Sequence, residues 1–217
     1  MVETETRDGA RPYRSELRQR QAADTRRRVV EAAIELFGRQ GFRATTFAQL
    51  AEEAGVSVET VRKHGPKSAL LQAALELSSF GVEGETDFLA TDLGETMMQL
   101  GNRDELAAFV GEAMLAINAP SAGLWMAVVS AAHGDEELSG FRDHMLALVR
   151  GQVDRALRLL ADREWLRVDV PLDDLVEAFC VITSVETYTR FVHVDGKPEV
   201  SYTAFVARTV RETILAA

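Results

Sequence analysis

Residues 25–71 contain two apolar helical patterns separated by a very short turn, and this feature constrains the fold more than any other. The second pattern begins at Thr46, and Gln49 follows three residues later, which is the spacing of a capping box. Gly55 is placed to end that helix, because glycine adopts a left-handed backbone without steric cost. Ser57 is placed to cap the next helix, so a single residue separates the end of one helix from the cap of the other. Two short helices joined in this way predict a helix-turn-helix.

Amphipathic helical patterns flank the helix-turn-helix on both sides. The preceding helix is expected to start at a cap on Asp24 or Thr25 and to end at Gly41, where a left-handed residue fits. A fourth helix is expected to start near Pro66, because proline suits the first turn of a helix. Apolar residues at helical spacing define the first pattern (Val30, Ala33, Ile34 and Phe37) and the fourth (Leu70, Ala73, Ala74 and Leu77).

These residues resemble the DNA-binding domain of the TetR family of bacterial regulators. The resemblance extends over the segment TRRRVVEAAIELFGRQGFRATTFAQLAEEAGVSVETVRKHGPKSALL. Its matching pieces are the helix that ends in LF, the GFRATT connection, the LAEEAGVS turn, the K-H pair and the following KSALL. A weaker similarity to the last helices of many members lies in TSVETY and GKPEVSYTAFVARTV.

The family resemblance implies an all-α fold, with an N-terminal three-helix helix-turn-helix domain and a helical C-terminal domain. We expect a flexible basic arm over residues 1–22, a DNA-binding domain over residues 23–80, and an effector-binding and dimerisation domain over residues 81–217. The resemblance further implies a homodimeric repressor that binds a palindromic operator in double-stranded DNA and is released by a small-molecule effector. The alternative is a TetR-shaped ligand-binding or protein-interaction dimer that has lost operator binding.

Two departures from the family pattern motivate that alternative. Members usually carry an aromatic residue where Arg62 stands and a phenylalanine directly after His64, where this chain continues with Gly65 and Pro66. The aromatic pair normally wedges the recognition helix and reaches the phosphate backbone. Its loss predicts a recognition helix that is frayed or reoriented in the free protein, although Arg62 can still contact phosphate as a cation.

Ten residues of the helix-turn-helix region are expected to contact DNA. Val58, Glu59 and His64 are expected to face base edges, where the Glu59 carboxylate can accept a hydrogen bond from a cytosine amino group. The alternative for Glu59 is a first-turn carboxylate that only favours the helix dipole. The residues expected to position the domain through phosphates are Thr45, Thr46, Ser57, Thr60, Arg62, Lys63 and Lys67.

Charge is divided unevenly along the chain. Residues 1–67 hold 13 Lys and Arg against 10 Asp and Glu, a net charge of +3, whereas residues 68–217 hold 11 against 24, a net charge of −13. Such asymmetry favours nucleic-acid binding, and the alternative is a merely mixed surface. The basic residues 1–22 fit either a mobile arm for the minor groove or a solvated tail or helical extension without specific contacts.

The rest of the chain is expected to be helical, because no segment sustains the alternation of apolar and polar residues that is typical of a strand. A break is expected at Asn118-Ala119-Pro120, and a last helix after Pro198. The other expected helices span residues 104–117, 121–133, 136–161 and 171–192. The family resemblance implies that the last two helices pair with those of a second subunit in an isologous interface. Their apolar pattern alone fits an intrachain core equally well.

The helical body offers candidates for an effector cavity and for a dimer interface. Methionine and aromatic side chains suit an adaptable apolar pocket, although each also suits an ordinary core. The residues expected to bind the effector are Met97, Met98, Phe109, Met114, Trp125, Met126, Val129 and Phe179. The residues expected at the dimer interface are Leu175, Phe179, Ile182, Tyr202, Phe205, Val206, Thr209 and Thr213.

The sequence carries no arrangement of residues for catalysis or metal binding, so we expect no enzyme, no cofactor and no metal. The four histidines lack the spacing of metal ligands; they are His64, His133, His144 and His193. Cys180 is the single cysteine, which excludes an intramolecular disulfide, and it is either packed and inert or a redox sensor.

Two further features bear on where the protein acts. No apolar run approaches the roughly twenty residues that cross a membrane. The N-terminus is charged and lacks the apolar region of a signal peptide. We therefore expect a cytoplasmic protein with no membrane partner.

Overall fold

The computed structural model of the chain describes residues 10–81, 83–84 and 87–216. Within this part of the chain the secondary structure is helical, apart from an isolated antiparallel bridge between Leu166 and Leu215, which confirms the predicted all-α class. The elements in chain order are α1 (Ala10–Ala44), α2 (Phe47–Ala54), α3 (Val58–Lys63), α4 (Lys67–Phe80), η1 (Phe88–Ala90), α5 (Asp92–Gln99), α6 (Arg103–Ala132), α7 (Glu136–Ala161), α8 (Leu172–Thr183), α9 (Val185–Tyr188), η2 (Thr189–Val194) and α10 (Glu199–Thr213).

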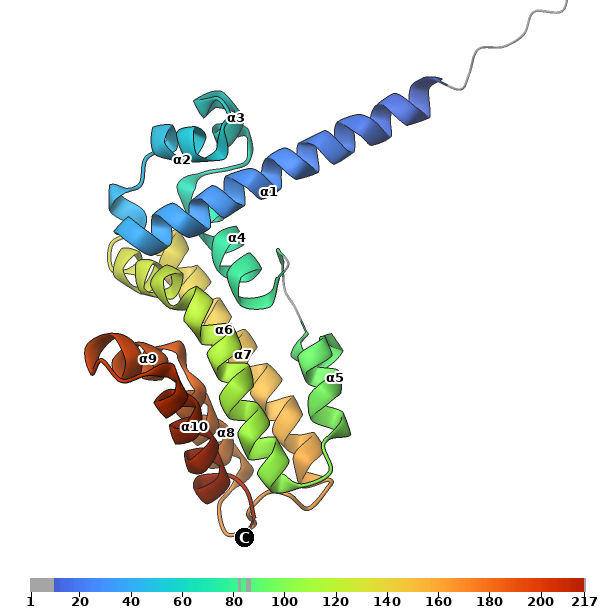
Figure 1. Ribbon diagram of the computed structural model, residues 1–217, viewed down its shortest axis with the longest axis vertical. Helices are drawn as coiled ribbons and strands as arrows, with labels where there is room; N and C mark the ends of the chain where they lie inside the picture. The colour runs from blue at the N-terminus through green and yellow to red at the C-terminus, as the bar shows by residue number, and fades with distance from the viewer. Residues whose placement is uncertain (1–9, 82, 85–86, 217) are drawn as a thin grey trace, which may run out of the picture.

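The helices form a head and an elongated body (Figure 1). The head consists of α1 to α4, and the body consists of α5 to α10. In the body, α6 and α7 pack side by side, with α8 and α10 on one side of them and α5 on the other (Figure 1). One core cluster joins α1, α2, α3 and α4 to the C-terminal half of α6, and a second fills the body. The head is therefore packed onto the end of α6 through a shared hydrophobic core.

The first helix is longer than the sequence pattern predicts. α1 begins at Ala10, so residues 10–22 are helical and the prediction of a flexible arm over this range is wrong; residues 1–9 lie outside the described residues. Residues 15–23 contain neither glycine nor proline and are mainly good helix formers, which explains the extension. The helix is kinked at Gly41, whose φ of 80° and ψ of 170° are non-helical. The N-terminal part of α1 projects beyond the head (Figure 1).

The central helix, α6, also differs from the prediction. It runs unbroken from Arg103 to Ala132, so the break predicted at Asn118-Ala119-Pro120 is wrong. A proline inside a helix removes one backbone hydrogen bond and normally favours a break. Tertiary packing overrides that preference here, because Asn118 before Pro120 and Ser121 after it are buried in the fold. In addition, the Ser78 hydroxyl of α4 donates a hydrogen bond to the Pro120 carbonyl oxygen over 2.9 Å.

Helix α6 is long and apolar enough to cross a membrane, whereas the sequence analysis expected no segment with this property. It is the one helix with this property in the described part of the chain. Of its apolar window, 44% is buried inside the fold, and the helix packs against α1, α4, α7 and α10. We therefore interpret α6 as the central helix of the body.

The C-terminal helices follow the predicted order. α7 has the predicted bounds, and the Asp135 side chain caps it by accepting a hydrogen bond from the Leu138 N–H over 3.1 Å. The helix predicted over residues 171–192 is divided, because α8 ends at Thr183 and Ser184 caps the short α9. The π-helical turn η2 continues from α9, and α10 then begins directly after Pro198.

Candidate DNA interface and ligand cavity

Helices α2 and α3 form the predicted helix-turn-helix. Thr46 caps α2, and the Gln49 side chain completes the capping box by accepting a hydrogen bond from the Thr46 N–H over 2.9 Å. Gly55 ends α2 with a φ of 62° and a ψ of 40°, the left-handed conformation that favours glycine. The Ser57 hydroxyl accepts a hydrogen bond from the Thr60 N–H over 3.1 Å and caps α3. The local signals in the sequence are confirmed.

Two arginines of α1 hold the helix-turn-helix at its turn and at its end. Arg28 donates hydrogen bonds to the carbonyl oxygens of Ala54 and Gly55, at the C-terminus of α2. Arg26 donates a hydrogen bond over 2.7 Å to the carbonyl oxygen of His64, at the C-terminus of α3. Cations at helix C-termini interact favourably with the unpaired carbonyl groups there. These contacts fix α3 relative to α1, and the sequence pattern did not single out either arginine.

Helix α3 is regular although the aromatic pair of the family is missing. Arg62 lies over the ring of Phe47 in α2, with its guanidinium carbon 5.5 Å from the ring centroid. A guanidinium stacks well on an aromatic face, so Arg62 supplies a packing contact as well as a charge. Val61 of the same helix is fully buried in the head core. α3 is therefore docked on α2, and the fraying expected from the sequence is not observed.

Nine of the ten predicted DNA contacts reach the surface at least in part. The exposed residues are Thr46, Ser57, Glu59, Arg62 and Lys63, and the half-buried residues are Val58, Thr60, His64 and Lys67. Glu59 and Lys63 form an ion pair at 3.0 Å, one turn apart on the exposed side of α3. Both side chains are thus partnered in the free protein and would have to part to contact DNA separately.

Thr45 and Lys67 do not have the phosphate-facing positions that were predicted. Thr45 is fully buried, and its hydroxyl donates a hydrogen bond to the Gly41 carbonyl oxygen over 2.8 Å. The Lys67 ammonium donates to the carbonyl oxygens of Phe42, over 2.7 Å, and of Thr45, over 2.6 Å. Burial lowers the pKa of Lys67. Both side chains stabilise the connection between α1 and α2, and a sequence pattern does not distinguish this use of a polar group from a DNA contact.

His64 lies between α3 and the loop that leads to α4. Partial burial lowers the pKa of His64, and the nearby Arg26 guanidinium lowers it further, while Glu83 acts in the opposite direction. The net effect favours the neutral imidazole. A neutral ring can donate one hydrogen bond and accept another, which suits a base edge better than a phosphate.

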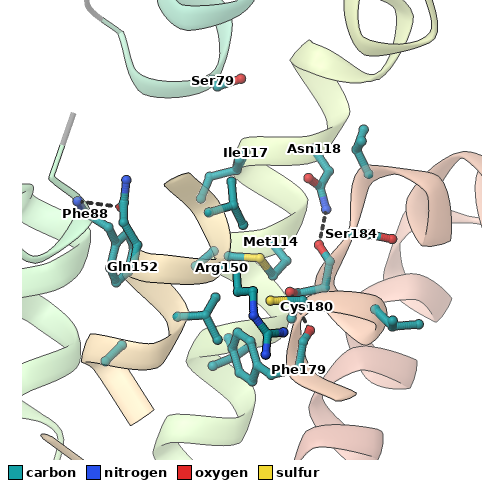
Figure 2. A pocket seen from close by; sticks show the side chains of 18 of the residues that line it. Ser79, Phe88, Met114, Ile117, Asn118, Arg150, Gln152, Phe179, Cys180 and Ser184 are labelled. Atoms are coloured by element: carbon teal, nitrogen blue, oxygen red, sulfur yellow. Dashed lines mark hydrogen bonds between the residues drawn. The ribbon is translucent and has the colours of Figure 1, made fainter. Parts of the chain in front are cut away.

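A cavity of about 560 Å³ lies in the body between α6, α7 and α8 (Figure 2). Its volume falls in the range of small-molecule binding sites, about 300–1,000 Å³. Leu75 and Ser79 of α4 also line it, so the cavity touches a helix of the head. At another side, the backbone N–H of Phe88 donates a hydrogen bond to the Gln152 side chain over 2.9 Å and ties η1 to α7 (Figure 2).

The structure brings together five of the eight residues predicted to bind an effector. Those that line the cavity are Met97, Phe109, Met114, Trp125 and Phe179. The other three lie elsewhere: Met98 packs in the body core, Val129 packs against the head core, and Met126 is 41% exposed. The sequence signal was the residue type alone, and residue type does not give the side of the helix that faces the cavity.

The cavity also has polar groups that the sequence analysis did not select. Arg150 of α7 forms an ion pair with Glu177 of α8, and both residues line the cavity. The Trp125 indole N–H donates a hydrogen bond to the Glu186 carboxylate over 2.5 Å. Asn118 of α6 is buried at the cavity wall. The signal that could have identified Asn118 is an amide inside an otherwise apolar helix, a position where a polar group needs partners.

Cys180 lines the same cavity. Burial raises the pKa of the Cys180 thiol, which opposes formation of the reactive thiolate and makes the packed, inert interpretation the better one. Among the described residues, no group of three or more His, Cys, Asp and Glu side chains is placed to hold a metal ion.

Half of the residues predicted for the dimer interface pack in the body core or line the cavity of the same chain. Leu175, Tyr202 and Val206 are buried in the body core, with at most 2% of each residue exposed, and Phe179 lines the cavity. The three buried residues are covered within the chain, because α10 packs on α6 and α8 packs on α7, so they are not available to a second subunit. Half-buried Phe179 stays a candidate for the interface. The remaining predicted residues are half-buried or exposed; they are Ile182, Phe205, Thr209 and Thr213.

The head also matches a known protein family. Residues 29–74 match the family described as bacterial regulatory proteins, tetR family. The matched segment starts in α1, ends in α4 and includes the whole helix-turn-helix. The head is a TetR-family domain. The resemblance read from the sequence is thereby confirmed, and a family of regulatory proteins agrees with the expectation that the chain is not an enzyme.

Solved structures with the TetR-family fold match nearly the whole chain. A putative transcriptional regulator from Saccharomonospora viridis in complex with choline has a TM-score of 0.69 and 15% identity, covering 90% of this chain and 100% of the other. The SmeT–triclosan complex has a TM-score of 0.68 and 16% identity, covering 88% and 92%. A TetR transcriptional regulator from Chloroflexus aurantiacus has a TM-score of 0.67 and 14% identity, covering 91% and 100%. These similarities establish the fold; no curated protein sequence matches the chain.

Proposed function

We propose that this TetR-family chain is a ligand-responsive transcriptional regulator, acting in the cytoplasm as a homodimeric repressor on a palindromic operator. One observation carries the proposal: a single continuous helix, α6, lines an apolar cavity and packs against the head that holds the helix-turn-helix. A ligand in the cavity and DNA at the head would thus act on the same rigid element. Binding of a small effector would then release the operator.

Helix α3 would enter the major groove, with the polar side chains of α3 facing the bases and the phosphates. The exposed Arg62 and Lys63 supply positive charge on this helix, and Thr46 and Ser57 supply hydroxyl groups at the N-termini of α2 and α3. Two heads of a dimer would contact half-sites about one helical turn, roughly 34–36 Å, apart. The α1 arginines that hold α3 would keep its orientation fixed during binding.

The projecting part of α1 adds a second basic surface to the head. Arg18 and Arg20 of this extension are exposed. We propose that this extension lies along the phosphates that flank the half-site. A helix fixed in position loses less conformational entropy on binding than a mobile arm does.

Coupling between cavity and head would pass through the middle of α6. Ile117, Asn118 and Trp125 line the cavity, and Pro120 of the same stretch accepts a hydrogen bond from Ser78 of α4. α6 and α4 also share the core of the head. A ligand that shifts this stretch of α6 would therefore move the head and change the separation of the two recognition helices in a dimer.

The dimer interface is proposed on the outward sides of α8 and α10. Val200 and Ala204 of α10 and Val181 of α8 are exposed apolar residues on these helices, and half-buried Phe205 and Ile182 lie beside them in sequence. Exposed apolar side chains on the last helices are available to a second copy of the chain, unlike the buried stripe of α10. A two-fold axis would bring the same helices of both copies together.

The proposal is tested by binding to the DNA that flanks the chain's own gene, measured by gel shift and footprinting. We expect two protected half-sites, loss of the shift in Lys63→Glu, and an unchanged shift in Arg158→Glu, an exposed charge reversal on α7, outside the proposed dimer interface. If the wild type folds, dimerises and binds ligands in the cavity but never binds this DNA or a random operator library, the alternative of a ligand-binding dimer replaces the regulator.

A further inference from the structure

We propose that the cavity selects apolar ligands that carry a hydrogen-bond donor, a hydroxyl or an amine, and that the Asn118 side-chain oxygen accepts this hydrogen bond. Ligands with a carboxylate in its place are disfavoured. The inference rests on the proposed role of the cavity as the effector site and adds the chemical class of the effector.

The two donors of the Asn118 amide are already used within the protein. Only 5% of Asn118 is exposed. Its Nδ2 donates hydrogen bonds to the carbonyl oxygen of Thr183, over 3.0 Å, and to the hydroxyl oxygen of Tyr202, over 2.9 Å. The Thr183 carbonyl can only accept, so it fixes the orientation of the amide: a flipped amide would place two acceptors against each other.

The oxygen of the same amide remains available. No residue in the described part of the chain donates a hydrogen bond to Asn118 Oδ1, and Asn118 lines the cavity. Figure 2 shows the amide nitrogen turned toward α8, with the oxygen on the other side of the amide. This oxygen is not among the fully buried atoms without a partner, which agrees with its position at the cavity wall. An apolar ligand would remove it from water, and the complex is then favoured when the ligand supplies a donor.

Other side-chain hydroxyls nearby are already engaged with the backbone. The Ser121 hydroxyl donates to the Ile117 carbonyl oxygen over 2.7 Å, and the Thr183 hydroxyl donates to the Phe179 carbonyl oxygen over 2.8 Å. The single proton of each hydroxyl is already used in these hydrogen bonds, so neither hydroxyl can donate to a ligand oxygen. The part of the cavity wall around Asn118, Ser121 and Thr183 therefore offers acceptors to a ligand.

The charges of the cavity disfavour an anion. Arg150 is paired with Glu177, and Glu186 is a second carboxylate in the lining. These three charges sum to −1. Both side chains of this pair are partly exposed, 46% for Arg150 and 68% for Glu177, so the cost to an anion arises where its carboxylate would lie next to Asn118 without a counter-charge in apolar surroundings. A hydroxyl carries no charge, and an amine can donate a hydrogen bond to the Asn118 oxygen, which a carboxylate cannot do.

Four probes of matched chain length test the inference on the full chain: 1-decanol, decylamine, sodium decanoate and 1-methoxynonane. The last is an isomer of decanol that lacks the donor. Binding is measured by displacement of a neutral, apolar fluorescent dye from the cavity. We expect decanol and decylamine to displace the dye at concentrations about tenfold lower than decanoate or the ether, the difference that one satisfied hydrogen bond can produce.

Two variants assign the preference to Asn118. In Asn118→Leu the ratio between decanol and methoxynonane should fall to about one, because both ligands then meet an apolar wall. Ser121→Ala is the matched control: it removes a lining hydroxyl that is already bonded to the backbone, and the ratio should persist. Since Asn118→Leu also removes two internal hydrogen bonds, its fold is checked by circular dichroism. If that variant does not fold, the wild-type series decides.

The outcomes separate this inference from the function on which it rests. Equal displacement by all four probes, or tightest binding by decanoate, overturns the donor preference while leaving the cavity as a ligand site. Persistence of the decanol preference in folded Asn118→Leu overturns the role of Asn118. A cavity that takes up neither dye nor any probe overturns the ligand-responsive function itself, and the inference with it.

Discussion

The side chain that Gly123 lacks would lie 3.0 Å from the backbone carbonyl oxygen of Gly38, so α6 and α1 meet backbone to backbone where the body joins the head. Both glycines are inside helices, where each costs up to about 1 kcal/mol relative to alanine. The close approach explains the glycine at position 123. The same contact lies within the part of α6 that lines the cavity, between Ser121 and Trp125, and it has little freedom to adjust.

Gly123→Ala should therefore destabilise the protein by about 1–3 kcal/mol, because the new methyl group meets backbone atoms rather than a side chain that can move. The measurement is the free energy of unfolding in urea. Gly38→Ala is the matched control, because a methyl group there would have no heavy atom within 4 Å. It should leave stability unchanged or raise it by up to about 1 kcal/mol. Similar losses in both variants would show that the backbone contact is not what matters.

The two lysines near α3 should respond differently to removal. Lys63→Ala should weaken DNA binding for all sequences and reduce the slope of log K against log salt by about 0.9, the value for one phosphate contact. Lys67→Ala should leave that slope unchanged and lower the stability of the head by about 1.5–3 kcal/mol, since its ammonium is bonded to two carbonyl oxygens. Salt-titrated binding and urea unfolding of both variants check this. A flatter slope in Lys67→Ala would instead support the phosphate contact that was predicted from the sequence.

The parts of the fold that local chemistry determines could be predicted from the sequence. The cap at Thr46, the left-handed Gly55 and the cap at Ser57 each depend on residues a few positions apart, and all three are present. The bounds of α7 were also predictable, because Asp135 and the apolar periodicity act within one helix. The helix-turn-helix followed from these local signals, whereas the family was inferred from the resemblance of the whole segment and is supported by the match over residues 29–74.

What the sequence could not give depends on contacts between distant residues. Pro120 indicates a break until the packing of α4 and α10 on α6 is known. The apolar stripe that contains Tyr202 indicates burial but not whether a second subunit or α6 covers it. Likewise, Thr45 and Lys67 are polar residues at the right place for DNA, and only the structure shows that backbone carbonyls bind them.

The α1 extension is expected to strengthen DNA binding without changing its sequence preference. Arg18→Glu combined with Arg20→Glu should weaken binding and flatten its salt dependence, because two exposed cations become anions. The relative affinities for different operators should persist, since phosphate contacts carry no sequence information. Arg158→Glu on α7, outside the proposed dimer interface, is the control for a change in overall charge. A double variant that behaves like this control would leave the extension without a role in DNA binding.

The proposed dimer interface makes a prediction about two alanines. Ala204→Arg on α10 should shift the protein from dimer to monomer in sedimentation, because a two-fold interface brings the new charge close to its own copy. Ala147→Arg on α7 is the matched control, with an exposed alanine in a helix outside the proposed interface. It should sediment as the wild type does. A dimer of unchanged affinity in Ala204→Arg would remove this side of α10 from the interface.

Stability should fall in mildly acidic solution, in part because of His64. Burial and the nearby Arg26 guanidinium lower the pKa of His64 in the folded state, whereas the unfolded chain has the ordinary value of about 6.5. As the pH falls through that value, the unfolded chain binds a proton that the folded protein resists, so the folded state loses stability.

The variant His64→Gln tests this contribution, because glutamine cannot take up the proton. The stability lost between pH 7.5 and pH 5.5, measured by urea unfolding, should therefore be smaller in the variant than in the wild type. Because the imidazole is only partly buried, water and salt screen part of the effect, and the difference should be modest. Identical losses in the two proteins would mean that His64 keeps its ordinary pKa in the folded state, and its neutral form could then no longer be assumed at the DNA interface.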